Sequence, residues 1–225
     1  MRLLSVEVRY DEKQYGPVSV ALERPGGGSD TLVIIAHGAG STMEYPALKA
    51  LQGFLVENGI AAARFNFAYA EAGKKRPDRA PLLEATWRAV ADALRESESP
   101  RRLVLCGRSM GGRIASRIAA DGYPCDGLVL LAYPLHPAGK PERLRSEHLP
   151  RIDAPMLFVQ GTRDALCGLE LLGPVLARLP RAELHVVEGG DHSFKVLKRS
   201  GRTADEVTAE IDETVLAWVK RTGRS

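Results

Sequence analysis

Short apolar runs without polar interruptions recur along the chain. They occupy residues 32–35, 103–106, 128–132 and 156–159. Strands of a parallel sheet have this composition, because helices cover both faces of the sheet and leave neither face in water. We therefore predict four central parallel strands at these positions.

Shorter or more alternating patterns add the remaining strands. Residues 4–9 and 18–23 alternate between apolar and polar positions, which predicts an antiparallel hairpin at an edge of the sheet. Further strands are expected just before Asn66 and over residues 184–187. The chain is thus predicted to be an α/β protein with about eight mostly parallel strands flanked by helices.

The segments between the strands carry helical periodicity. Apolar residues recur there every three or four positions, which places them on one face of a helix. A capping box of Thr203 and Glu206 precedes the last such stripe, and Pro174 leaves open where a helix near residues 169–179 begins. Two core-facing stripes are Leu83, Trp87, Val90 and Leu94, and Val207, Ile211, Val215 and Trp218.

Length and composition narrow the class of protein. A chain of 225 residues suffices for a single α/β domain over residues 1–225, and the longest candidate lid, residues 133–153, is too short for a lid domain. The net charge of +3 is too small to indicate nucleic-acid binding. No signal-peptide or membrane-spanning stretch is present, and the three cysteines form no Cys-x-x-Cys pair. We expect a cytoplasmic protein without membrane association, and the sequence does not indicate its oligomeric state.

The strand at residues 103–106 leads directly into Gly107-Arg108-Ser109-Met110-Gly111, and helical sequence follows. A strand, a Gly-x-Ser-x-Gly turn and a helix in this order are typical of a nucleophile elbow, where glycines leave room for a tight backbone. A serine in an ordinary glycine-rich turn would show the same pattern, so the rest of the chain must decide. Ser109 is the candidate nucleophile.

A nucleophilic serine needs a histidine base and a buried acid that orients the base. Asp164 follows the strand at residues 156–159, and His192 follows the strand at residues 184–187. The order Ser, Asp, His is that of nucleophile-elbow enzymes. Asp191 is a weaker candidate acid, because neighbouring side chains on a turn rarely face each other, and Asp164 could instead cap the following helix.

The other four histidines are weaker candidates for the base. His185 lies inside the last predicted strand and is expected to be half exposed. His37 follows the strand at residues 32–35, and we expect it to orient the next loop. His136 and His148 lie after residues 128–132 and could touch substrate instead of acting as the base.

An oxyanion formed during acyl transfer would need preorganised N–H donors. One is expected from Met110, which begins the helix after Ser109 and gains from the helix dipole. The other is expected from the small-residue loop His37-Gly38-Ala39-Gly40, with Ala39 as our choice. The same loop could be only a strand-to-helix turn, but its joint occurrence with the other features favours a catalytic role.

Five motifs between about Thr31 and Phe194 carry a resemblance to a known family. They are His37-Gly38-Ala39-Gly40, Arg64-Phe65-Asn66-Phe67, Gly107-Arg108-Ser109-Met110-Gly111, Tyr133-Pro134-Leu135-His136-Pro137 and Asp191-His192-Ser193. Together they resemble the small bacterial α/β hydrolases of the dienelactone-hydrolase-like branch, which is also similar to the testis-expressed and NSL-complex subunit hydrolase-like proteins. The resemblance implies a minimal α/β-hydrolase fold with Ser109, Asp164 and His192 as the triad, and it implies no particular substrate.

The resulting hypothesis is a serine hydrolase that acts on small ester, thioester or related acyl substrates through an acyl-enzyme. We expect Gly38, Arg108, Phe67 and His136 to line the substrate site, and we expect no metal and no cofactor. Acyl transfer to another acceptor would use the same residues. A catalytically silent scaffold that binds a protein partner is the alternative from another class.

Basic residues cluster in two loops near the predicted site. Arg108 lies between them in the sequence, and together these charges could attract an anionic substrate. Acidic residues interleave with both clusters, so a solvated surface is the preferred interpretation. The clusters are Lys74, Lys75, Arg76 and Arg79, and Lys140, Arg143 and Arg145.

Overall fold

The structure, a computed structural model, describes residues 1–223 and contains one eight-stranded sheet with the order β1-β2-β4-β3-β5-β6-β7-β8. Neighbouring strands from β4 to β8 are parallel, whereas β1 and β2 are antiparallel to each other and β2 is antiparallel to β4. The strands are β1 (Arg2–Tyr10), β2 (Lys13–Glu23), β3 (Thr31–Ala36), β4 (Ala61–Phe65), β5 (Arg102–Arg108), β6 (Gly127–Leu131), β7 (Met156–Gly161) and β8 (Ala182–Val187).

The predicted strands are confirmed, and their ends differ in ways that the backbone explains. All residues of β3, β6 and β7 are buried, as the continuous apolar runs indicated. β6 ends at Leu131 instead of Ala132, because Ala132 has a φ of 50° and leaves the extended conformation. The edge hairpin is longer than predicted, since the first residues of β2 are exposed and carry no apolar pattern.

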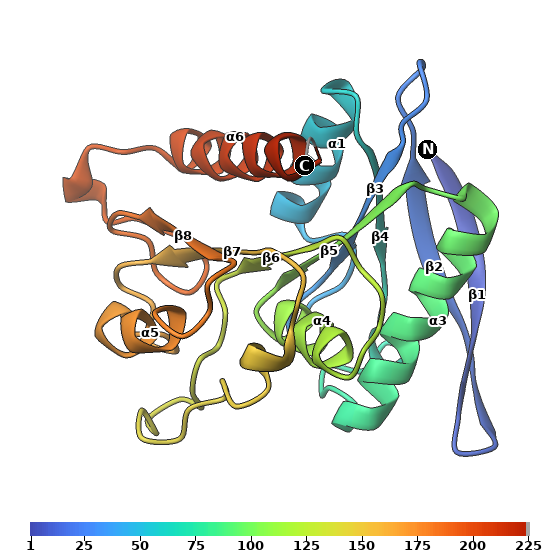
Figure 1. Ribbon diagram of the computed structural model, residues 1–225, viewed down its shortest axis with the longest axis horizontal. Coiled ribbons are helices and arrows are strands. Elements are labelled where there is room, and N and C mark those ends of the chain that lie inside the picture. The colour runs from blue at the N-terminus through green and yellow to red at the C-terminus, as the bar shows by residue number, and fades with distance from the viewer. Residues whose placement is uncertain (224–225) are drawn as a thin grey trace.

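Helices cover both faces of the sheet (Figure 1). α1 and α6 lie side by side on one face, and α3, α4 and α5 lie on the other. Each face has its own apolar core, with Trp87 and Ile114 on the α3 and α4 side and Leu51 and Val215 on the α1 and α6 side. The helices are α1 (Pro46–Glu57), α2 (Ala68–Glu71), α3 (Ala80–Glu98), α4 (Met110–Ala120), α5 (Leu169–Leu176) and α6 (Ala204–Thr222).

Local signals set the ends of the last two helices. The predicted capping box of Thr203 and Glu206 begins α6, with side-chain to backbone hydrogen bonds in both directions. α5 begins at Leu169 and contains Pro174 inside the helix. Because proline lacks an N–H donor, one helical hydrogen bond is missing inside α5. The helix ends at Leu176, three residues before Leu179.

The long segment between β6 and β7 forms no lid. It contains only the single-turn helix η1 (Leu149–Arg151) and folds on itself, because the Arg145 N–H donates to the Leu135 carbonyl at 2.7 Å. The Tyr133 hydroxyl donates to the Arg145 carbonyl at 2.8 Å. Within residues 1–223, no helix combines the length and the apolar character that crossing a membrane requires.

Candidate active site

Ser109 occupies a strained turn between β5 and α4. β5 ends at Arg108 and α4 begins at Met110, so Ser109 alone makes the turn, with φ 51° and ψ −116°. A non-glycine residue at positive φ costs on the order of 1–3 kcal/mol. The Ser109 N–H donates to the Leu131 carbonyl at 2.8 Å, which holds the turn against the end of β6.

The two glycines of the motif are needed because other backbone atoms pass very close to them. A Cβ on Gly107 would lie 2.2 Å from the Gly112 nitrogen. A Cβ on Gly111 would lie 2.6 Å from the His37 carbonyl oxygen and 2.7 Å from that of Ala36. The start of α4 is therefore packed directly against the end of β3, as a nucleophile elbow requires.

The structure brings the three candidate catalytic side chains together. Ser109 Oγ lies 2.8 Å from His192 Nε2, and His192 Nδ1 lies 2.8 Å from Asp164 Oδ2. The Asp164 side chain is fully buried, whereas His192 keeps 26% of its side chain exposed. Asp164 also accepts the Leu166 N–H at 2.8 Å through Oδ1. This geometry lets His192 take the Ser109 proton while Asp164 fixes the imidazole tautomer.

Gln160 also contacts the acid, and the sequence analysis did not identify it. Gln160 is the second-to-last residue of β7, and its Nε2 donates to Asp164 Oδ2 at 2.6 Å. Its Oε1 is buried without a hydrogen-bond partner in the described part of the chain. The one available signal was a polar residue at the end of an otherwise apolar strand.

The alternative roles for Asp191 and Asp164 do not match the contacts. Asp191 Oδ1 accepts the N–H groups of Ser193 and Lys195 at 2.7 and 2.9 Å, so it shapes the loop that carries His192. Asp164 does not cap α5, whose N-cap is Gly168. The acid side chain is thus free to serve His192.

His37 organises the loop after β3, as predicted. Its Nδ1 lies 2.8 Å from the Gly38 carbonyl, and its Nε2 accepts the Phe67 N–H at 3.1 Å. Only the neutral ring, protonated at Nδ1, satisfies both bonds. Burial lowers the pKa of His37 to about 4, so the ring stays neutral and the loop stays connected to the end of β4.

A second serine and histidine pair in the chain lacks the features of a catalytic pair. His148 Nε2 lies 2.8 Å from Ser116 Oγ, and that hydroxyl donates to the Arg113 carbonyl at 2.8 Å. His148 must therefore donate to Ser116, so it cannot act as its base. Ser116 is fully buried, and burial together with nearby arginines lowers the pKa of His148 to about 4.

The last two histidines are also engaged elsewhere. His185 on the edge strand β8 is half buried, with its Nε2 2.7 Å from Glu210 Oε1 on α6. His136 is buried, and its Nδ1 lies 2.9 Å from the Pro137 carbonyl. Its backbone N–H donates to the Leu166 carbonyl in the Asp164 loop. Within residues 1–223, no hydrogen bond joins His136 to the triad.

The predicted oxyanion donors lie on the two loops that meet at Ser109. A Cβ on Gly38 would be 3.5 Å from the Ser109 Cβ, so the backbone of this loop runs directly beside the nucleophile. Ala39 follows in an exposed position, and Met110 is the first residue of α4. In the described part of the chain, neither the Ala39 nor the Met110 N–H donates to another protein group.

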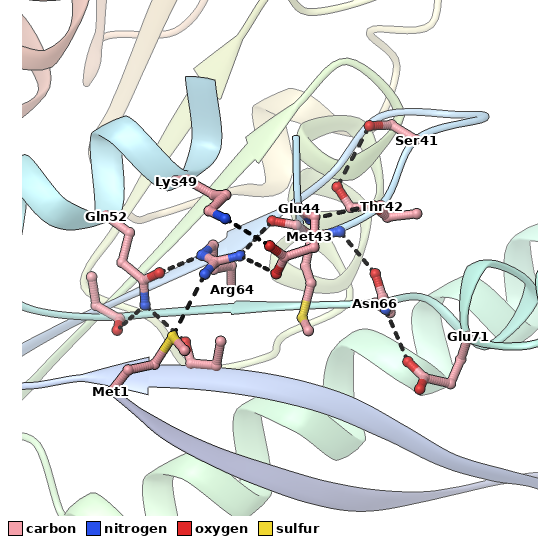
Figure 2. A network of polar contacts seen from close by, with 12 residues as sticks. Met1, Ser41, Thr42, Met43, Glu44, Lys49, Gln52, Arg64, Asn66 and Glu71 are labelled. Atoms are coloured by element: carbon pink, nitrogen blue, oxygen red, sulfur yellow. Dashed lines mark hydrogen bonds and ion pairs between the residues drawn. The ribbon is translucent and has the colours of Figure 1, made fainter. Parts of the chain in front are cut away.

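The loop after β3 is held in place by alternate residues of the Arg64-Phe65-Asn66-Phe67 motif (Figure 2). The Arg64 guanidinium donates to the Met43 carbonyl at 2.8 Å, and Asn66 Oδ1 accepts the Met43 N–H at 2.8 Å. Both backbone groups of Met43 are therefore fixed to the end of β4. Together with the bond from Phe67 to His37, these contacts position the loop that carries Ala39.

Arg64 is a buried charge, with a side chain that is 3% exposed. Its Nε donates to Gln52 of α1, and its guanidinium contacts Glu44 Oε1 at 2.6 Å (Figure 2). Lys49 and Arg64 together lower the pKa of Glu44. An ion pair supplies the partner that a buried guanidinium requires.

The structure corrects one predicted substrate contact and refines another. Phe67 is fully buried and packs edge-on against His37 with ring centroids 5.1 Å apart, so its side chain does not face an open site. Arg108 donates to the His192 carbonyl at 3.0 Å and to Ser193 Oγ at 3.1 Å. Its guanidinium also lies 4.9 Å from the centre of the Tyr45 ring. Arg108 therefore holds the His192 loop.

No group of three or more Cys, His, Asp or Glu side chains within residues 1–223 is placed to hold a metal ion. Cys106 and Cys167 are buried. Burial raises the pKa of Cys167 to about 12, so the thiol beside the Asp164 loop is not a ready nucleophile.

A doubly covered parallel sheet with a Ser-His-Asp arrangement at the carboxyl ends of its strands defines the α/β-hydrolase class of fold. Residues 29–220 match the family model described as an alpha/beta hydrolase domain, and the chain belongs to that family.

Solved structures share the whole architecture at low identity. An alpha-beta serine hydrolase homologue from Coxiella burnetii is 23% identical with a TM-score of 0.72, covering 95% of this chain and 96% of that chain. A serine hydrolase from Xanthomonas campestris, described as lacking a lid, is 22% identical with a TM-score of 0.72 and coverages of 97% and 95%. Dienelactone hydrolase from Anabaena variabilis is 20% identical with a TM-score of 0.74 and coverages of 98% and 97%. These similarities establish the fold.

Proposed function

We propose that the chain is a serine hydrolase that cleaves small ester, thioester or related acyl substrates through an acyl-enzyme intermediate. The observation that carries the proposal is the chain of two hydrogen bonds that joins Ser109 Oγ to His192 and His192 to Asp164, each 2.8 Å long. Ser109 lies on a strained elbow and retains 9% exposure, so a small carbonyl compound can reach it.

In the proposed reaction, His192 Nε2 removes the Ser109 proton as Oγ attacks the substrate carbonyl carbon. The N–H groups of Met110 and Ala39 stabilise the oxyanion that forms, aided by the positive end of the α4 dipole. The tetrahedral intermediate collapses, and His192 gives the proton to the departing alcohol or thiol. Water, deprotonated by His192, then attacks the acyl group, and Ser109 leaves with the proton returned.

The absence of a lid between β6 and β7 supports small substrates. A long acyl chain needs an extended apolar wall, and the turn-rich segment after β6, which contains only one helical turn, does not form one. The resemblance to the testis-expressed and NSL-complex subunit hydrolase-like proteins supports the triad assignment without indicating a substrate. Dienelactone hydrolase is among the structural neighbours, so small lactones belong in the substrate screen.

The basic loops add one question about substrate charge. Lys74, Lys75 and Arg76 are exposed, and the Lys75 carbonyl would lie 3.7 Å from a Cβ on Gly40 in the loop after β3. We infer that these side chains form a solvated surface. An ester with a carboxylate and its neutral counterpart should then have similar kcat/KM values, whatever the salt concentration.

The proposal is tested by steady-state hydrolysis of p-nitrophenyl acetate and S-phenyl thioacetate by the wild type, Ser109→Ala and Ser116→Ala. Ser116→Ala is a matched control, because it removes the other serine that contacts a histidine at 2.8 Å. We expect Ser109→Ala to lose at least about 1,000-fold in kcat and Ser116→Ala to keep its activity. Equal activity in all three proteins would show that Ser109 is not the nucleophile, and a folded but inactive wild type would favour the scaffold alternative.

A further inference from the structure

A cavity of about 400 Å³ lies between α1 and α6, next to the loop that carries His192. Its wall is formed by the N-terminal halves of both helices, the end of β6 and the residues after His192. None of Ser109, Asp164 and His192 is among its lining residues, so it is a separate space beside the triad. Its apolar lining includes Leu48, Leu51, Leu131, Phe194, Val207 and Ile211.

Asp212 is the unusual member of this lining. It lies on the core-facing side of α6, between Ile211 and Val215 of the apolar stripe, and is only 6% exposed. Within residues 1–223, its carboxyl group takes part in no hydrogen bond and no ion pair. Burying an unpaired carboxylate is costly, and proteins normally provide such a group with a partner.

The other charged groups around the cavity do not serve Asp212. Arg108 is bonded to His192 and Ser193 and covers the Tyr45 ring. Lys195 and Asp205 line the cavity but are exposed at its mouth. Burial raises the pKa of the Asp212 carboxyl to about 7. Asp212 also helps to raise the pKa of the buried Cys106 thiol, which carries no charge to pair with it.

We propose that this cavity binds a small apolar amine, whose ammonium group pairs with the Asp212 carboxylate and whose apolar part lies between α1 and α6. The binding site is additional to the proposed hydrolysis and does not depend on it. A single buried carboxylate beside apolar side chains suits an organic cation and offers too few oxygen ligands for a metal ion. A volume of about 400 Å³ is in the range of small-molecule sites.

The pairing selects the ligand by charge as well as by shape. A charge-assisted hydrogen bond is roughly twice as strong as a neutral one, so an amine should bind more tightly than an alcohol of the same shape. A carboxylate of similar size would be repelled by Asp212. The ligand would also contact Arg108 and Ser193, which hold the His192 loop.

The test is isothermal titration of full-length protein with three probes of similar shape: phenethylamine, 2-phenylethanol and 3-phenylpropionate. The proteins are the Ser109→Ala background, which removes the proposed chemistry, and the same background with Asp212→Asn. Asp205→Asn is the matched control, because it neutralises an exposed carboxylate at the mouth of the same cavity. Ala47→Phe, at an exposed lining position on α1, narrows the cavity without touching Asp212.

We expect phenethylamine to bind at least about 10-fold more tightly than 2-phenylethanol, and 3-phenylpropionate not to bind. Asp212→Asn should abolish this preference, Asp205→Asn should keep it, and Ala47→Phe should weaken the amine and the alcohol alike. Three results would overturn the proposal: equal affinities for all three probes, amine binding that survives Asp212→Asn, or no saturable amine binding at millimolar concentration. All of them are independent of whether the chain is a hydrolase.

Discussion

Replacing Gln160 by leucine tests whether its hydrogen bond to the triad acid Asp164 contributes to catalysis independently of the stability of the fold. The substitution removes the 2.6 Å bond from Nε2 to Asp164 Oδ2, and the carboxylate keeps its bonds to the Leu166 N–H and to His192. A hydrogen bond to a charged group contributes about 1.5–3 kcal/mol. If about half of this is expressed in the transition state, kcat should fall roughly 4- to 13-fold with KM unchanged.

Stability should respond differently, because Gln160 also carries a buried carbonyl oxygen without a partner among the described residues. Leucine removes that unsatisfied group, which costs about 1–3 kcal/mol in the wild type, and this gain offsets the lost bond. We expect the free energy of unfolding in urea to change by less than about 1 kcal/mol. Activity should therefore fall in a protein that is as stable as the wild type.

The assay is p-nitrophenyl acetate hydrolysis alongside urea unfolding for the wild type, Gln160→Leu and Gln160→Glu. The glutamate variant places a second carboxyl group against Asp164, and two carboxylates at this distance cannot both ionise. It should therefore lose more kcat than Gln160→Leu. An unchanged kcat in Gln160→Leu together with a loss of stability would refute the reasoning and leave Gln160 as a packing residue only.

Three further predictions concern stability. Gly111→Ala should destabilise the protein by at least about 3 kcal/mol, because its Cβ would lie 2.6 Å from the His37 carbonyl oxygen. Gly53→Ala, in α1 with open space around it, should stabilise the protein by about 0.5–1 kcal/mol. A higher melting temperature for Gly111→Ala than for Gly53→Ala would contradict this packing. The pKa of the Asp212 carboxyl is about 7 in the native state, compared with 3.8 in the unfolded chain. Because the native state holds this proton more tightly, the free energy of unfolding decreases as pH rises from 3.8 to 7. The free energy of unfolding of Asp212→Asn should thus exceed that of the wild type by about 2 kcal/mol at pH 8, which is half the full linkage value because the cavity admits solvent. The two proteins should be equally stable at pH 4, and a difference that does not depend on pH would contradict this. Because the pKa of His37 is lowered to about 4, the wild type should lose up to about 3 kcal/mol between pH 6.5 and 4, and His37→Asn should show a shallower loss in urea unfolding if His37 is responsible.

The sheet could be predicted from the sequence because its central strands are buried on both faces. The continuous apolar runs of β3, β6 and β7 have no other simple explanation in a chain of this length. The predicted strand ends were less accurate where the backbone leaves the extended conformation within an apolar run, as at Ala132, which has a positive φ. The candidate nucleophile, acid and base were found because each directly follows a predicted strand.

Residues that act through long-range polar contacts could not be predicted in the same way. Arg64 and Gln160 each stand as one polar residue beside an apolar run, and the sequence shows the exception without its partner. Asp212 lies among Glu210, Glu213 and Thr214, so the sequence does not mark it as a buried residue. Arg64 reaches Met43, which is 21 positions away and comes close only after β3 and β4 pair. Phe67 was misjudged for the same reason, since its position just after β4 did not reveal that its ring is buried in the core.

The central claim is that Ser109 is an activated nucleophile, and covalent labelling tests it most directly. Folded wild type, Ser109→Ala and His192→Ala are treated with a fluorophosphonate probe, and the modified residue is mapped by mass spectrometry. The structure predicts one adduct on Ser109 that both substitutions abolish, since Oγ lies 2.8 Å from His192 Nε2. An unlabelled wild type, or an adduct on another residue such as Ser193, would contradict the claim.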